Sequence, residues 1–233
     1  TERRFEDVVV GEVWLCAGQS NMDFQLQRAD GGKDAAAQAA ELDLRLCDRQ
    51  GSPGGGRVRL TPEQLKAIAR GEFYSGTWKV ASPENAATFS AVGYFFAERL
   101  RADLDVPIGL IDVSVGGSST EGWVPSEDLR FDEELRPLVE GDLTTHLTHP
   151  FIRERTAYQL AETGGGRHFF EPGYLYETAI DPLTPFALRG VLWYQGESNA
   201  HAPWLADKLF RAMVAAWRRA WERPALPLYY VQL

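Results

Sequence analysis

The sequence predicts an α/β protein folded as a three-layer α/β/α sandwich around a five-stranded parallel sheet. Apolar runs typical of strands alternate along the chain with helical segments, which implies parallel strands joined by right-handed crossovers. Three of the runs end in polar, glycine-rich residues, as strands do where an open α/β sheet binds ligands. With 233 residues, the chain is long enough for one such domain with a sizeable core.

The five expected strands are short apolar runs, and most are apolar at consecutive positions, as strands covered on both faces are. They are residues 8–17, 42–47, 107–115, 190–194 and 227–233.

The expected helices have different sequence signals. Residues 33–41 are alanine-rich, and a short helix begins at Thr61-Pro62-Glu63, with threonine as its cap and proline in its first turn. Apolar stripes at helical spacing mark residues 88–104 and 204–221. Residues 174–180 form a short helix that Asp181-Pro182 is expected to stop. We expect residues 126–170 to be an irregular excursion with one or two short helices.

Composition excludes several classes of protein. A net charge of −9 argues against a nucleic-acid partner, and no apolar run approaches the length of a membrane span. The two cysteines, Cys16 and Cys47, are too few for a disulfide scaffold or a four-ligand zinc site. A disulfide between them requires neighbouring strands, and buried free thiols are the favoured alternative.

Candidate chemistry lies at three of the predicted strand ends. Ser20 follows the first strand and could be a nucleophile, although Ser20 and Asn21 could instead cap the next helix. Gly116-Gly117 follows the third strand, and Asn199 follows the fourth. Acyl transfer needs a nucleophile together with amide donors aimed at the developing oxyanion, and serine, glycine and asparagine supply them.

These blocks resemble the SGNH hydrolase superfamily and, within it, the sialate O-acetylesterase group of carbohydrate esterases. The resemblance rests on residues 18–22 (Gly-Gln-Ser-Asn-Met), 116–117, 121–123 (Glu-Gly-Trp) and 193–200 (Trp-Tyr-Gln-Gly-Glu-Ser-Asn-Ala). It spans nearly the whole chain and thins between Asp128 and Phe170. It implies a flavodoxin-like fold, with residues 1–233 forming a single esterase domain.

The resemblance also implies roles for individual residues. Ser20 attacks the acyl carbonyl, while the Ser20 amide, an amide of Gly116 or Gly117 and the Asn199 side chain hold the oxyanion. Hydrolysis proceeds through an acetyl-serine without a metal or organic cofactor. Contacts with the substrate are assigned to five further residues: Gln19, Gln195, Glu197, Glu121 and His201.

The sequence departs from the superfamily at the general base. Relatives carry an Asp-x-x-His block after the fifth strand, and no such block occurs here. We therefore expect the domain to be incomplete at its C-terminus and a further segment to carry the Asp-His pair. His201 is an alternative base. The other histidines, His146, His149 and His168, are expected in surface-loop or structural roles.

The function predicted from the sequence is removal of acetyl groups from sugar hydroxyls, on sialic acid or on a polysaccharide, as acetyl xylan esterases do. One alternative is a domain that binds acetylated sugars without turnover, and another is a lipase or thioesterase of the same superfamily. Trp123 and Trp204 could line a sugar-binding cleft or pack in the core. The family resemblance suggests a secreted or periplasmic protein, and the sequence predicts no oligomeric state.

Overall fold

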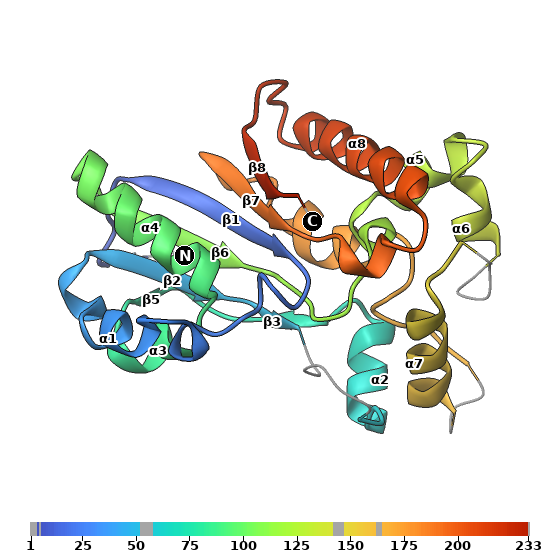
Figure 1. The fold of residues 1–233 in the computed structure, drawn as a ribbon, viewed down its shortest axis with the longest axis horizontal. Helices are drawn as coiled ribbons and strands as arrows, with labels where there is room; N and C mark the ends of the chain where they lie inside the picture. The colour runs from blue at the N-terminus through green and yellow to red at the C-terminus, as the bar shows by residue number, and fades with distance from the viewer. Residues whose placement is uncertain (1–3, 5, 52–57, 142–146, 162–164, 233) are drawn as a thin grey trace.

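A computed structural model describes residues 4, 6–51, 58–141, 147–161 and 165–232 (Figure 1). Its centre is a six-stranded sheet in the order β5-β2-β6-β1-β7-β8. The strands are β1 (Glu12–Gly18), β2 (Leu44–Asp48), β5 (Lys79–Val80), β6 (Ile108–Asp112), β7 (Gly190–Tyr194) and β8 (Leu228–Val231). A separate antiparallel pair joins β3 (Gln50–Gly51) to β4 (Tyr74–Ser75).

Five strands of the central sheet are parallel, and β5 is an antiparallel edge strand beside β2. The expectation of a purely five-stranded parallel sheet is therefore wrong by one strand. Strand β5 has only two residues, both exposed, so it gives no apolar run for a sequence pattern to detect. The first strand also begins later than predicted. Val8 and Val10 are exposed and precede the register, which starts where Glu12 pairs with Ile108.

Helices cover both faces of the sheet, which confirms the three layers (Figure 1). One face carries α1 (Gly32–Ala37), α3 (Pro83–Thr88) and α4 (Ala91–Leu104), and the other carries α8 (Pro203–Ala220). Alternate residues of β1 enter the two layers, because side chains alternate across a strand: Trp14 and Cys16 pack with α4, whereas Leu15 and Ala17 face the layer of α8.

The described part of the predicted excursion contains three α-helices rather than one or two short helices. These are α5 (Ser126–Phe131), α6 (Arg136–Glu140) and α7 (Pro150–Leu160). Helix α7 lies beside α2 (Pro62–Ala69) in a lobe at the lower right of Figure 1. The predicted start of α2 is confirmed, since Thr61 and Gln64 form a capping box.

Two other helix boundaries differ from the prediction. The segment 88–104 is divided, because Phe89 ends α3 and the Ser90 hydroxyl accepts from the Gly93 amide to begin α4. Asp181-Pro182 does not stop the helix before it. The π-helical turn η5 (Tyr176–Ile180) continues into the 3₁₀ turn η6 (Asp181–Leu183), where proline occupies the first turn and its missing N–H costs no hydrogen bond. No helix in the described ranges is both long and apolar enough to cross a membrane.

Candidate active site

The structure brings the three polar strand ends together at the carboxyl edge of the sheet. The Gln19 amide donates to the Tyr194 carbonyl at 3.0 Å, which ties the end of β1 to the end of β7. The Val115 amide donates to the Gly18 carbonyl at 2.9 Å, which ties β1 to the segment after β6. Gly18 is required at this junction, since a Cβ there would lie 2.1 Å from the Tyr194 oxygen.

Ser20 is exposed at this junction, on a turn in which the Met22 and Asp23 amides both donate to the Gln19 carbonyl. It caps no helix. The next two helical elements, η1 (Leu26–Arg28) and α1, have Gln25 and Gly31 at their N-caps. The alternative role as a helix cap is therefore wrong, and Ser20 is exposed to solvent.

The Gly116-Gly117 pair forms a β-turn beside this serine. The Ser118 amide donates to the Val115 carbonyl at 3.1 Å, and Gly117 has a φ of +80°, as the third residue of a type II turn requires. A Cβ placed on Gly116 would lie 3.9 Å from Cβ of Ser20 and 3.8 Å from Oδ2 of Asp23. Gly116 therefore presents bare backbone to Ser20, and a side chain there would occupy space that a substrate could use.

Asn199 lies on the turn η7 (Glu197–Asn199) after β7 and is 1% exposed. Its Oδ1 accepts from the Thr120 amide at 2.8 Å and from the Thr120 hydroxyl at 2.9 Å. Its Nδ2 donates to Oε2 of Glu121 at 2.9 Å. These partners fix the orientation of the side-chain amide, because the Thr120 N–H can only donate, and they leave the second Nδ2 hydrogen free for another acceptor.

The five residues assigned to substrate contact surround this junction, and several also link its parts. Gln19 accepts from the Ser198 amide at 3.3 Å, and Gln195 donates to the Ser118 carbonyl at 2.8 Å. Glu197 accepts from the Asn21 side chain. These bonds connect the segment after β7 with the segment after β1 and with the segment after β6. The three polar segments therefore form one connected framework.

Glu121, on η3 (Thr120–Trp123), is buried below Asn199. Burial raises the pKa of its carboxyl, and donation from Asn199 and the nearby His201 act in the opposite direction. Its position against Asn199 makes it a support for that side chain.

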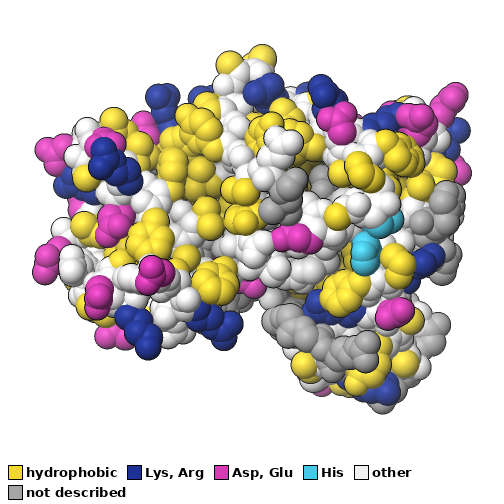
Figure 2. Space-filling view, viewed as in Figure 1, with side chains coloured by type: hydrophobic (Ala, Val, Ile, Leu, Met, Phe, Trp, Pro, Cys, Tyr) yellow, Lys and Arg dark blue, Asp and Glu magenta, His cyan; other side chains and the backbone are white. Residues whose placement is uncertain are grey.

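His201 lies at the surface, and its Nε2 is 2.9 Å from the Leu147 carbonyl. The His149 ring contacts it edge-on, with centroids 4.9 Å apart. Figure 2 shows histidine side chains in cyan at the surface, and the histidines that are not buried among the described residues are His201 and His149. His149 is the N-cap residue that precedes α7, and its Nδ1 accepts from the Phe151 amide at 3.1 Å.

His168 has a structural environment, as predicted. Its Nε2 lies 2.8 Å from Oε1 of Gln159, and its Nδ1 accepts from the Phe170 amide at 3.0 Å. Burial, together with the nearby Arg155 charge, lowers its pKa to about 3, so the ring is neutral at physiological pH. Both ring nitrogens are occupied, which removes His168 as a candidate base.

Trp123 and Trp204, which the sequence placed either in a sugar-binding cleft or in the core, differ in their exposure. Trp123 is fully buried and packs edge-on against Trp193 and Trp217, with centroids 5.7 and 6.4 Å away. Trp204 is 52% exposed at the start of α8. Only Trp204 is available to a ligand.

Sequence reasoning missed a group of carboxylates at the same edge of the sheet. Asp48 and Asp112 are the last residues of the neighbouring strands β2 and β6, and they are paired in register. Burial raises the pKa of Asp112 to about 8, with Asp23 and Asp48 adding repulsion. Loss of solvent around Asp23, reinforced by Asp48, raises the pKa of that carboxyl to about 6. Their positions at parallel strand ends were the signal that could have found them.

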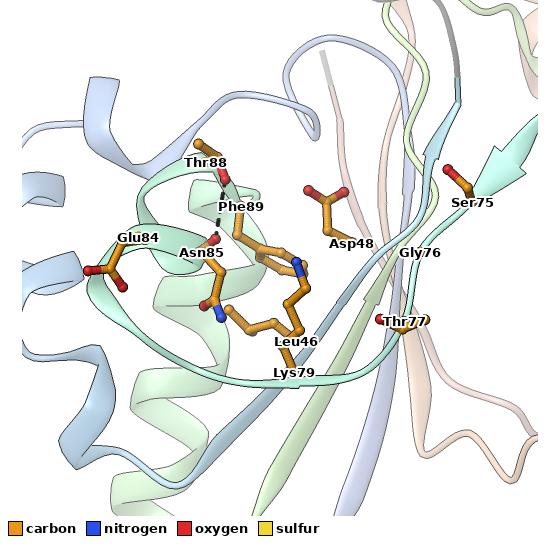
Figure 3. Close-up of a pocket in the computed structure, with 10 residues that line it drawn as sticks. All are labelled: Leu46, Asp48, Ser75, Gly76, Thr77, Lys79, Glu84, Asn85, Thr88 and Phe89. Atoms are coloured by element: carbon orange, nitrogen blue, oxygen red, sulfur yellow. Dashed lines mark hydrogen bonds between the residues drawn. The ribbon is translucent and has the colours of Figure 1, made fainter.

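A cavity of about 490 Å³ opens beside Asp48 (Figure 3). Its walls combine Leu46 and Asp48 from β2, Lys79 from β5 and several side chains of α3. A second cavity, of about 580 Å³, lies on the opposite side, where Asn199 and Glu197 face α8 and β8. The strand-end junction is thus flanked by open space on both sides. Within the described ranges, no group of three or more His, Cys, Asp or Glu side chains is arranged to hold a metal ion.

Comparisons with known proteins find similarity to carbohydrate esterases. A model of the sialic acid-specific acetylesterase family of carbohydrate esterases matches residues 160–233. Sialate O-acetylesterase from Rattus norvegicus is 31% identical over 237 residues, and the human protein is 30% identical over 227 residues. The chain is similar to the sialate O-acetylesterases. Each of these two alignments covers 94% of this chain, so the similarity to sialate O-acetylesterases extends well beyond the short sequence blocks that carry the resemblance.

The crystal structure of a carbohydrate acetylesterase from Xanthomonas citri is also similar, with 33% identity, a TM-score of 0.65 and 96% of this chain covered. This chain spans 41% of the rat sialate O-acetylesterase and 41% of the Xanthomonas protein, and 38% of the human one. The resemblance to SGNH-like carbohydrate esterases that the sequence blocks indicate is confirmed.

Proposed function

We propose that this chain is the part of a serine-dependent carbohydrate O-acetylesterase that holds the nucleophile and the oxyanion hole. The observation that carries the proposal is the junction of the three strand ends around Ser20. In the described part of the chain, the amides of Ser20, Gly116 and Gly117 donate no hydrogen bond to the protein, and one Nδ2 hydrogen of Asn199 is also free. Free donors around an exposed serine are what a developing oxyanion needs.

The proposed reaction has two steps. Oγ of Ser20 forms a bond to the acetyl carbonyl carbon, a base takes the hydroxyl proton, and the carbonyl electron pair moves onto oxygen to give the oxyanion. Collapse of this intermediate breaks the bond between the carbonyl carbon and the sugar oxygen, which takes the proton from the base and leaves as the sugar hydroxyl, so that acetyl-serine remains. Water then attacks the acetyl-serine and releases acetate and free Ser20. No step needs an oxidant or a reductant.

The base that takes the Ser20 proton has two alternative sources. His201 is the histidine in the described ranges that lies beside Asn199 and Glu121 on the surface. The other source is an Asp-x-x-His block in a longer chain, as the family resemblance implies. Whichever group is the base, its removal should slow the attack by several orders of magnitude, because an unassisted serine is a weak nucleophile.

The test is acetyl-ester hydrolysis, measured for this chain and for a longer chain that continues past Leu233. Ser20→Ala is expected to abolish hydrolysis in whichever chain is active, with unchanged thermal stability because Ser20 is exposed. His201→Gln separates the two bases, since activity that survives it excludes His201. Hydrolysis that persists in Ser20→Ala would contradict the proposed nucleophile.

A second candidate function is binding of acetylated sugars without turnover. It is favoured by the absence, in the described ranges, of any histidine hydrogen-bonded to Ser20. Retained binding of an acetylated sugar without hydrolysis in the longer chain would support it. Comparison of acetyl with longer acyl esters tests the lipase or thioesterase alternative, which predicts a preference for long chains.

A further inference from the structure

Arg155, on α7, is a buried arginine without a carboxylate partner among the residues that the structure describes. The side chain is 6% exposed, and its Nε is buried with no hydrogen-bond partner. Arginine is almost never buried unless it is paired, since an uncompensated charge is costly to remove from water. In a chain with 33 acidic and 24 basic side chains, an unpaired buried guanidinium needs a physical explanation.

The contacts of Arg155 lead to the Gly116-Gly117 turn. Its Nη1 donates to the Gly116 carbonyl at 3.5 Å, and its guanidinium lies over the rings of Phe170 and Phe151, at 5.1 and 5.8 Å from their centroids. A Cβ on Gly117 would lie 3.1 Å from the same Nη1. The guanidinium thus packs on one side of the turn, whereas Ser20 lies beside the Cβ direction of Gly116.

The Gly116 carbonyl belongs to the same peptide unit as the Gly117 N–H. In a trans peptide these two groups point in opposite directions, so the Gly117 N–H points away from Arg155. A cation at the carbonyl end polarises this peptide and makes its N–H a stronger donor to negative charge, as charge-assisted hydrogen bonds are.

We propose that Arg155 is a positioning residue for the oxyanion hole, which holds the Gly116-Gly117 peptide so that the Gly117 N–H donates to the tetrahedral oxyanion. This role explains why Arg155 has no carboxylate partner among the described residues. A neighbouring carboxylate would cancel the positive field of the guanidinium, which stabilises the oxyanion. Arg155 and Phe170 are buried on their side of the turn, where the charge is screened less than in water. This inference rests on the proposed esterase function.

The decisive variant is Arg155→Met, which keeps an apolar side chain over Phe170 and removes the charge. We expect kcat for acetyl-ester hydrolysis to fall by about tenfold to a hundredfold with little change in KM, less than the ~10²–10³ typical when an oxyanion donor is removed outright. Arg155→Lys keeps the charge and is expected to retain more of the rate. Arg99→Met, at an exposed arginine on α4, is the matched control and should leave the rate unchanged.

A second measurement does not depend on turnover. In a ¹H–¹⁵N spectrum of the wild-type protein and Arg155→Met, the Gly117 amide proton is expected to move upfield, and the sheet glycines Gly109 and Gly190 should not move. An unmoved Gly117 signal in a folded variant overturns the inference, whatever the activity. Loss of the rate in Ser20→Ala together with an unchanged rate in Arg155→Met overturns it while leaving the proposed function intact.

A third result would assign Arg155 differently. If Arg155→Met raises KM for a carboxylated sugar ester and not for a neutral one, with kcat unchanged, the guanidinium binds a substrate carboxylate. That outcome overturns the positioning role. An inactive wild-type protein with a shifted Gly117 signal contradicts the proposed function and supports the contact between Arg155 and the turn.

Discussion

The two adjacent glycines of the site differ in what their missing side chains provide. Gly117 has a φ of +80° and packs against Arg155 and Phe151, so glycine is needed there for backbone geometry. Gly116 has no positive φ, and a Cβ on it would make only ordinary contacts with Ser20 and Asp23. The absence of a side chain at Gly116 therefore leaves space beside Ser20, the proposed nucleophile, and has little effect on the geometry of the turn.

Alanine at Gly116 separates these roles. We expect Gly116→Ala to lower acetyl-ester hydrolysis by about tenfold or more, because displacement of a substrate by about 1 Å costs up to ~10² in rate. Its free energy of unfolding should change by less than about 1 kcal/mol, measured by urea denaturation. Gly117→Ala is the matched comparison and should be destabilised by more than about 1 kcal/mol, because alanine disfavours its positive φ. Equal stability losses in the two variants would contradict this division.

At the scale of single elements, the sequence pattern identified those whose signal is local. Apolar runs located the five parallel strands, and the amphipathic stripe located α8. Strand β5 was missed because two exposed residues have no period, and its partner β2 lies more than thirty positions earlier. The sequence indicated Ser20, Gly116 and Asn199 as site residues, because each one follows an apolar run that was predicted to be a strand. Arg155 was not predictable, since its contact with Gly116 joins an irregular excursion to a distant turn.

Helix α8 carries two tryptophans with opposite surroundings. Trp217 is fully buried, and its Nε1 donates to the Trp123 carbonyl at 3.0 Å. Trp217→Ala should therefore lower the free energy of unfolding by about 3–5 kcal/mol, through a cavity and a lost hydrogen bond. Trp204→Ala, on the same helix but half-exposed, should cost less than about 0.5 kcal/mol. Urea denaturation of both variants measures the difference, and a Trp204 effect as large as that of Trp217 would show that the burial assignment is wrong.

At the scale of the whole molecule, stability is coupled to pH through the carboxylates at the sheet edge. Asp112 is 4% exposed, and its Oδ1 accepts from the Ser114 amide at 2.9 Å. Its folded-state pKa is about 8, against 3.8 for the ordinary carboxyl. The folded state therefore binds more protons than the unfolded state between these two values, and stability falls as the pH rises through that window.

Asp112→Asn should remove most of this dependence. The amide Oδ1 can still accept from Ser114, and no charge forms in the buried site as the pH rises. We expect the free energy of unfolding of the wild-type protein to fall between pH 5 and pH 8.5, to an extent set by its raised pKa, and that of the variant to fall much less. Asp30→Asn, at an exposed turn, is the control and should keep the wild-type dependence. Parallel curves for the wild-type protein and Asp112→Asn would rule out Asp112 as the source.

The placement of the two thiols has a consequence for the conditions under which this fold survives. Cys16 on β1 and Cys47 on β2 are free and buried, with β6 between their strands and their side chains in opposite layers. Strands two positions apart are separated by about 9–10 Å, beyond the reach of a disulfide. No bridge can therefore form without dismantling the sheet. The fold accordingly draws no stability from a disulfide between these two cysteines, and a reductant has no such bond to break.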